Sequence, residues 1–504
     1  MTALYRALPL LLLTCCLSYS SGAQRVYKTN SVLASGSWYK ISVPGEGIYK
    51  IDLSLLSSLG ISGPVPSAQI RLFGKTGAIL PEDLSKPYID DLEELALSVI
   101  DGGDGTLNGS DYALFYSKGP HQWTTDTANR RFRHQKNLYS DQVYYFLSIG
   151  GTGKRVQLQP PGQTSSVTVN SFDERYYHEL DSVNFLSSGK EWYGEEFSQM
   201  PGRSLSRQFN IPASNVVINQ PVTLVSSLVS RSVGGNSRFD ALINNQLVQQ
   251  SPIPAISGGT LDLFAQQVTQ ESAGVLSQPT LSLTFNYIPG GFNAQGWLNW
   301  FELHYRRELK LAANQQLSFR DWSSVGNAGV EFKIGTIAGG IDVWEVSDPF
   351  TPVKMNVSIT GSEASFRNDA SVIREYIATA GSFLIPQALG RIENQDLHNS
   401  SEVDYVIITH PDFLSQAQRL AAFHTQINNL RVKVATTSQV FNEFAAGISD
   451  PTALRDYVKM YYDKYRSSWN DRKYLLLFGK GSFDYKNRIN GNTNFVPVYE
   501  TVSS

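Results

Sequence analysis

The stretch 404–487 alternates short apolar runs with helical patterns, and this alternation constrains the fold more than any other feature of the chain. The apolar runs are nearly continuous, as in strands that are buried on both faces of a parallel sheet. They are residues 403–408, Val432–Thr436 and Tyr474–Phe478. Connections between such strands are right-handed crossovers, so the three strands are predicted to run parallel.

Helical patterns separate the predicted strands. Over residues 413–427 the apolar side chains recur at the spacing of one helix face. Further on, Ser438 is predicted to cap a short helix that ends at Gly447. Asp450 at the N-cap and Pro451 at the first helical position then begin a longer helix, because a proline there loses no hydrogen bond.

The predicted sheet has a candidate site at one edge and is incomplete. Ligands of parallel sheets bind outside the carboxyl ends of the strands, so the loops from Thr409, Thr437 and Gly479 are predicted to share that edge. One more apolar run follows, but its Pro497 argues against a central strand. Because three parallel strands leave an edge and a face uncovered, we expect the natural domain to continue past Ser504.

Length and charge exclude several classes of protein. A chain of 504 residues is long enough for three or four domains, each with its own core. The formal net charge of -3 and the pI near 6.2 show no basic surplus. Neither nucleic acid nor an anionic membrane surface is therefore an expected partner.

The N-terminus is predicted to be a cleaved secretory signal. Arg6 precedes the apolar run 7–17, and residues 21–23 are small, as a signal peptidase requires. The run is too short to span a bilayer, and no later stretch is suited to a transmembrane segment. Lipid attachment at Cys15 or Cys16 is a weaker alternative. These are the only two cysteines, so the mature chain is expected to lack disulfides, thiolate metal sites and a cysteine nucleophile.

Upstream of residue 404, short alternating runs are separated by Gly, Pro and Asp turns, as in β-rich domains. One pair, residues 38–43 and 47–52, is predicted to form a hairpin around Pro44-Gly45. The predicted fold class is multidomain, with β-rich, sandwich-like N-terminal domains before an incomplete α/β domain. Its parts are a signal peptide at 1–23, a β-rich domain at 24–165, a sandwich-like domain at 166–310, a small β module and linker at 311–400, and a truncated α/β domain at 401–504.

Several polar residues could have a chemical role, but a structural role explains each of them better. The carboxylates of residues 101–111 suggest a calcium loop, but Gly103 and Gly105 occupy alternate ligand positions, which favours a turn. Three histidines are also expected to be structural. His304 belongs to a charged row on a strand, His410 lies in a loop without a cysteine or serine partner, and His424 lies on the inner stripe of a helix.

The loop after the third predicted strand is the more promising place. Asp484 is a carboxylate at the carboxyl edge and could line a substrate pocket, although turn chemistry also explains Asp484 and Ser482. Gly479 and Gly481 lack the Lys-Ser/Thr ending of a phosphate-binding loop. No cofactor and no metal site are predicted.

Motifs in both halves of the chain resemble one known family. In the C-terminal part these are Asn442-Glu443-Phe444, Gly447, residues 450–456, and Tyr474–Phe478 followed by residues 479–486. In the N-terminal part they are residues 38–41, 47–51, 111–116 and 191–195. They resemble the gingipain-type (C25, caspase-like) cysteine peptidases, and specifically the sortase branch that serves the type IX secretion system of Bacteroidota. The resemblance spans nearly all of the mature chain.

The resemblance implies peptide-bond cleavage by a cysteine thiolate paired with a histidine, on loops at the carboxyl edge. In the family both residues follow the third strand by many residues, so they are expected beyond Ser504 and this chain is expected to be inactive. Asp484 and Ser482 are the substrate-pocket candidates.

For the sortase branch, the resemblance further implies removal of C-terminal signal domains from secreted cargo, at the outer membrane surface or in the periplasm. The expected partners are cargo proteins and type IX secretion components. The alternative hypothesis is a non-catalytic cell-surface protein whose β domains bind glycans or protein partners.

Overall fold

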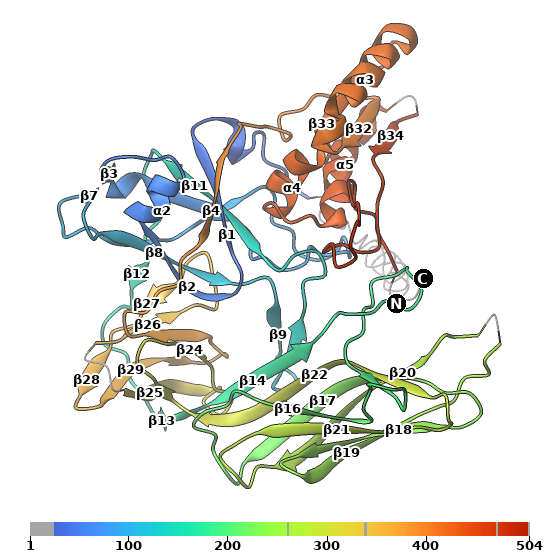
Figure 1. The fold of residues 1–504 in the computed structure, drawn as a ribbon. Helices are drawn as coiled ribbons and strands as arrows, with labels where there is room; N and C mark the ends of the chain where they lie inside the picture. Colours follow the sequence, from blue (N-terminus) through green and yellow to red (C-terminus); the bar gives the residue numbers. More distant parts are fainter. Residues whose placement is uncertain (1–24, 260–261, 337–339, 470–471, 502–504) are drawn as a thin grey trace, which may run out of the picture.

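The computed structural model describes residues 25–259, 262–336, 340–469 and 472–501, and the predicted signal peptide lies outside these ranges. Strands dominate the fold, and the longer helices gather in a C-terminal α/β unit (Figure 1). In the described part of the chain, no helix combines the length and apolar character needed to cross a membrane. The fold is multidomain and β-rich, which confirms the predicted fold class.

The N-terminal β-domain packs its sheets around one apolar core that includes Ile41, Tyr49, Leu72, Phe115 and Leu147. The short helix α2 (Leu53–Ser58) is capped by Asp52 and contacts β2 and β31. One sheet has the order β31 (Gln387–Ile392), β1 (Trp38–Val43), β11 (Val143–Ile149), β4 (Ile70–Gly74), β5 (Glu93–Leu95). A second has the order β2 (Glu46–Asp52), β8 (Tyr112–Lys118), β6 (Ser98–Ile100), and β3 (Val65–Pro66) pairs with β7 (Thr106–Leu107).

The predicted hairpin of residues 38–43 and 47–52 is wrong. β1 pairs with β11 and β31, whereas β2 pairs with β8 in the other sheet. Both strands bury one face against the same core, so their alternating pattern is compatible with either arrangement. The turn at Pro44-Gly45 therefore passes the chain from one sheet to the other.

The second body is a two-sheet sandwich with the inner residues Leu224, Phe239, Phe285, Phe301 and Leu303 (Figure 1). One sheet has the order β14 (Ser171–Glu179), β22 (Gln295–Glu308), β17 (Pro221–Arg231), β20 (Gln266–Val275), with β15 (Glu196–Phe197) paired to β22. The other has the order β16 (Ser206–Asn210), β21 (Ser282–Ile288), β18 (Ser237–Ile243), β19 (Gln246–Ile253).

The third body is a smaller pair of sheets around the rings of Phe319, Phe332, Phe366 and Tyr376. One sheet has the order β12 (Gln157–Leu158), β27 (Val353–Lys354), β26 (Asp342–Glu345), β30 (Tyr376–Thr379), β24 (Gln316–Phe319). The other has the order β13 (Val167–Val169), β25 (Asn327–Thr336), β29 (Glu363–Ala370), β28 (Ser358–Thr360), with β23 (Lys310–Leu311) beside β25. The chain then returns through β31 to the first sheet of the N-terminal β-domain.

A two-stranded arm, β9 (Gln122–Asp126) and β10 (Arg131–Gln135), extends from the N-terminal β-domain to the sandwich (Figure 1). Phe132 is buried against Trp322, with ring centroids 5.4 Å apart. His134 stacks on Tyr177 of β14 at 3.5 Å between centroids. The arm therefore joins the three β-bodies at one place.

The C-terminal α/β unit contains the predicted parallel sheet. Its strand order is β33 (Val432–Thr436), β32 (Tyr405–Thr409), β34 (Tyr474–Phe478). The helical elements are η3 (Pro411–Phe413), α3 (Leu414–Asn428), α4 (Thr437–Ala445), α5 (Pro451–Tyr465) and η4 (Arg466–Ser468). Asp450 caps α5 ahead of Pro451, as predicted. The cap of α4 is Thr436, which forms a capping box with Gln439, so the prediction of Ser438 is wrong by two residues.

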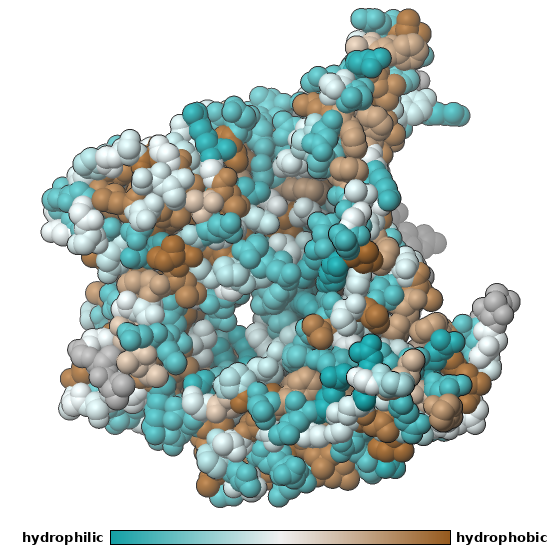
Figure 2. Space-filling view, viewed as in Figure 1, coloured by the Kyte–Doolittle hydropathy of each residue, from teal (hydrophilic) through white to brown (hydrophobic). Residues whose placement is uncertain are grey.

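The edge strand β34 is poorly covered. The parallel register places Leu475 beside Val406 and Leu477 beside Ile408, so the four side chains share a face. Val406 and Ile408 are 6% and 0% exposed beneath α4 and α5, whereas Leu475 and Leu477 are 49% and 42% exposed. Figure 2 shows apolar side chains on the visible face of this unit. Among the described residues, β34 is thus an apolar strand that pairs on one side only, with β32.

A buried cation holds the α/β unit to the N-terminal β-domain. The His398 Nδ1 lies 2.6 Å from Oε2 of Glu443 on α4, and Nε2 lies 3.0 Å from Oδ1 of Asp90 before β5. Burial alone would lower the pKa of His398, but the hydrogen bonds to Asp90 and Glu443 outweigh it and raise the pKa to about 9. A protonated imidazole therefore bridges two carboxylates in the interior.

The same cluster has the spacing of a metal site, because ligand atoms of Asp91, His398 and Glu443 lie within 4.8 Å of one another. However, the oxygens are already occupied by proton donors. Asp91 accepts from the Ser31 hydroxyl and the Val32 N–H, and Glu443 accepts from the imidazole. Hydrogen bonds from the protonated imidazole and from Ser31 and Val32 therefore explain the cluster better than a metal ion does.

The first prediction concerns pH. The pKa of His398 is raised from 6.5 in the unfolded chain to about 9 in the fold, so its stabilisation is complete below pH 6.5 and is lost as pH rises through 9. The difference corresponds to about 3 kcal/mol in the free energy of unfolding. Denaturant titrations across this window should show that decline for the natural chain. It should be absent in His398→Gln and retained in His424→Gln, whose half-buried histidine lies on α3 against Tyr405. A flat profile for the natural chain would contradict the assignment.

The second prediction concerns β34. Leu475→Lys should reduce self-association measured by static light scattering, because a charge on an exposed strand opposes edge-to-edge pairing. The free energy of unfolding should change by less than about 0.5 kcal/mol, since the side chain is half exposed. Leu84→Lys is the matched control, with an equally exposed leucine in a turn. Equal association of the natural chain and Leu475→Lys would show that β34 is not the contact.

Candidate functional site

The strands β32, β33 and β34 end at one edge of the parallel sheet, as predicted, but the predicted loop at Thr437 is wrong, because β33 passes directly into α4 there. Thr409 at the end of β32 donates its hydroxyl to the carbonyl oxygen of Phe478 at the end of β34, at 3.0 Å. Thr409 also lies beside Thr436 in the register of β32 and β33. The three strand ends are therefore level, and the segments that follow them form the edge at which parallel sheets bind ligands.

The glycines after β34 permit close packing of the backbone. A Cβ at Gly479 would lie 2.8 Å from Cγ2 of Val496, and one at Gly481 would lie 2.5 Å from Cγ1 of Val498. The segment that presses on them is held by a hydrogen bond of 2.9 Å from the Phe495 N–H to a carbonyl oxygen of the loop. This packing explains both glycines without a phosphate-binding role.

Asp484 is fully buried and organises its own loop. Its Oδ2 accepts from the Ile489 N–H at 2.7 Å, and its N–H donates to Oγ of Ser482 at 3.1 Å. Its Oδ1 lies 3.6 Å from Nη1 of Arg488 but accepts no hydrogen bond from the described residues. The structure brings Asp484 and Ser482 together at the predicted edge, and their part in a substrate pocket stays a prediction.

Arg488 connects this loop to the sandwich. Besides facing Asp484, its guanidinium forms an ion pair with Asp181, which follows β14. It also lies 4.7 Å above the ring of Trp192, which stacks on Phe483 of the loop at 5.8 Å between centroids. The position of the loop is therefore set from outside the α/β unit as well as from within it.

The three histidines have structural contacts, as predicted. His410 lies at the sheet edge, where its Nδ1 accepts from the Asp412 N–H at 3.3 Å and caps η3. His424 contacts the amide oxygen of Asn428 on α3 at 2.9 Å. His304 lies 3.2 Å from Glu302, two residues away on β22.

The calcium-like stretch forms turns, as predicted. The Asp101 carboxylate accepts from the Gly103 N–H at 3.0 Å, and the Asp104 carboxylate accepts from the Thr106 N–H at 2.9 Å. These carboxylates complete turns between β6 and β8.

Residues that carry the family resemblance also dock the α/β unit. Asp450 accepts from the Leu80 N–H at 3.0 Å, and Asp456 pairs with Arg25 at 3.0 Å. Burial raises the pKa of Asp450 to about 6 against the effect of its hydrogen bonds. Neither these contacts nor the His398 cluster has a local signal in the sequence, because the partners are hundreds of residues apart.

Two comparisons bear on the site. Residues 398–504 match the model of peptidase family C25. The structure of dimeric latent PorU from Porphyromonas gingivalis is similar at a TM-score of 0.79 and 25% identity, and the match covers 94% of this chain. It covers 45% of the PorU chain, so this chain spans about half of that protein. None of the curated proteins compared with the chain matches it.

Several further solved structures are similar only at TM-scores too low to support an argument. The C-terminal CBM6 of LamC from Zobellia galactanivorans aligns at a TM-score of 0.16 and 13% identity, over 25% of this chain and 98% of that one. The family match includes the parallel sheet, the segments that follow its strands, and His398 with Glu443, whereas the PorU match extends through the β-bodies. Residues 398–504 therefore match peptidase family C25, and the chain as a whole is similar in fold and sequence to PorU.

Proposed function

We propose that this chain is the N-terminal portion of a secreted gingipain-like cysteine peptidase of the sortase kind. In this proposal the enzyme removes C-terminal signal domains from type IX secretion cargo at the cell surface. The observation that supports it best is the three-stranded parallel sheet whose strands end at one edge, inside the segment that matches family C25. The PorU-like arrangement of the β-bodies supports the sortase branch over other C25 enzymes.

In this proposal the N-terminal portion contributes the fold that positions the substrate, and it does not contribute the nucleophile. Residues 17–504 contain no cysteine, so the thiolate nucleophile of a C25 enzyme is not among them. The proposed role of the sheet edge is to hold the scissile peptide while the thiolate attacks its carbonyl carbon, which splits one difficult step into two easier ones. No cofactor is proposed for this chemistry.

Asp484 is the residue proposed to contact the substrate. A buried carboxylate oxygen without a hydrogen bond calls for an explanation, and Oδ1 of Asp484 is such an atom in the described structure. A small movement of the loop would offer this oxygen to an N–H or cationic group of the peptide. Ser482, which accepts from the Asp484 N–H, would keep the loop in shape during that movement.

The proposed cellular location and partners follow from the similarity to the sortase branch. The enzyme acts at the outer membrane surface or in the periplasm, with cargo proteins and components of the secretion machinery as its partners. The β-bodies, which make up most of the described chain, would position the cargo relative to the sheet edge.

The third prediction tests this function on the protein encoded by the whole gene. A reporter cargo that ends in a signal domain should be cleaved, and the protein should be labelled by a thiol-reactive peptide probe. Asp484→Asn should reduce kcat/KM by about 100-fold, as expected when a substrate is misplaced by about 1 Å. Cleavage is followed by mass spectrometry of the released domain.

Asp83→Asn is the matched control, because that carboxylate caps an exposed turn. Unchanged cleavage by Asp484→Asn would remove Asp484 from the substrate pocket and leave the peptidase function standing. Absence of both cleavage and labelling in the natural protein would overturn the peptidase proposal and favour a binding protein.

A further inference from the structure

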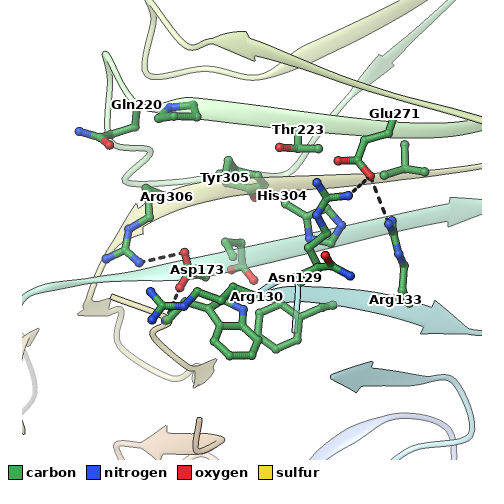
Figure 3. A pocket seen from close by; sticks show the side chains of 16 residues that line it. Asn129, Arg130, Arg133, Asp173, Gln220, Thr223, Glu271, His304, Tyr305 and Arg306 are labelled. Atoms are coloured by element: carbon green, nitrogen blue, oxygen red, sulfur yellow. Dashed lines mark hydrogen bonds and ion pairs between the residues drawn. The ribbon is translucent and has the colours of Figure 1, made fainter. Parts of the chain in front are cut away.

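A cavity of about 350 Å³ lies between the tip of the arm and the outer face of the sandwich (Figure 3). Residues 129–133 of the arm form one wall, and strands β14, β17, β20 and β22 form the other. On these strands Leu224 and Leu303 point into the sandwich core, so Thr223 and His304 point outward into the cavity. The cavity is therefore separate from the sheet edge of the α/β unit.

Two arginines of the arm share one carboxylate. The guanidiniums of Arg131 and Arg133 both reach Oε2 of Glu271 on β20, and the Arg133 contact is 3.1 Å. Figure 3 shows Arg133 and Glu271 pointing toward each other across the cavity. Phe132 lies between the arginines in the strand, and its ring is buried against Trp322, which lines the same cavity. That anchor fixes the direction of both arginines.

The rest of the cavity wall is electrically balanced. Arg306 lies 3.0 Å from Asp173, and Glu174 lies 2.8 Å from Arg307. These side chains therefore satisfy one another and leave no charge for a ligand.

The arm tip, by contrast, has a surplus of positive charge. Arg130, Arg131 and Arg133 line the cavity with Glu271 as the carboxylate beside them, an excess of two charges. Counting the buried Glu302, which lies 3.8 Å from Arg133, leaves an excess of one among the groups at the cavity, and Asp126, opposite Arg131 in the arm, balances it only from outside the cavity lining. Each guanidinium has five N–H donors, so one shared carboxylate oxygen cannot satisfy the donors of two guanidiniums.

The tip is also held in shape before any ligand arrives. Asp126 at the end of β9 accepts from the N–H of Asn129 at 3.1 Å and from its side-chain amide at 2.7 Å. Arg130 follows in the left-handed region, with φ of 50°. A preformed turn lowers the entropic cost of ordering the arginines around a ligand.

We propose that the arm-tip cavity binds the oxyanion group of a small molecule, a carboxylate or a phosphate, between Arg130, Arg131 and Arg133. The Glu271 carboxylate occupies part of the proposed binding site and contacts two of the arginines as the oxyanion of a ligand would. Planar guanidiniums bind such groups through paired N–H donors, which lysine cannot do. The cavity volume lies at the lower end of the range of about 300–1,000 Å³ that is typical of small-molecule sites. The proposal is independent of the peptidase function.

The fourth prediction is measured by isothermal titration calorimetry on the 504-residue chain at low ionic strength, where charge interactions are screened least. The probes are inorganic phosphate and malonate, which distinguish the two sources of the oxyanion. At least one should bind saturably at a single site. Arg131→Gln should weaken binding about tenfold, as expected for one charge-assisted hydrogen bond. Arg238→Gln, an equally exposed arginine paired with Asp240 on β18, should have no effect.

Glu271→Gln distinguishes a ligand site from a structural ion pair. Removing the competing carboxylate should strengthen binding of the same probe about tenfold. Thermal melts identify any variant that fails to fold, and Arg133→Gln then replaces Arg131→Gln. Binding that is unchanged in Glu271→Gln and Arg131→Gln, or no saturable binding of either probe, would overturn the proposal. Preference for phosphate or for malonate assigns the ligand class.

Discussion

The buried His398 cation is the interaction on which the arrangement of the molecule depends. It lies between a carboxylate of α4 and a carboxylate of the N-terminal β-domain, so removing it would leave the two negative charges without the cation between them. Lys75 strengthens the same junction by donating to the carbonyl oxygen of Phe444 at 2.7 Å. Burial lowers the pKa of Lys75 to about 8, which shows how far this interior is removed from water. The position of the sheet edge therefore rests on charges contributed by distant parts of the chain.

Local patterns in the sequence were sufficient to predict the α/β unit. The three strands are short and apolar, and Asp450 with Pro451 marks a helix start that needs no tertiary context. The pairing of strands in the N-terminal β-domain was not predictable in this way. An alternating strand shows which face is buried, but not which strand lies beside it, and for β1 the neighbours are β11 and β31.

The candidate site, too, is predictable from local sequence only in part. The rule for parallel sheets places Asp484 at the correct edge, because that rule depends only on the order of strands and loops. The burial of Asp484 depends on Arg488, and Arg488 in turn contacts Asp181 and Trp192 of the sandwich. No pattern within the loop indicates contacts with residues some 300 positions earlier. Likewise, the run of arginines at the arm tip is visible in the sequence, but its convergence on Glu271 is not.

The pairing of β31 with β1 has a consequence for biogenesis. Trp38 lies opposite Ile392 in the finished sheet, so one of the first strands to be made acquires its neighbour only after more than 350 further residues. Closing such a long loop is slow compared with local pairing. The sandwich and the third body lie within that loop and can fold first, each around its own core. The N-terminal β-domain is therefore completed late, and an exported chain would keep an open sheet edge until residues 387–392 had emerged.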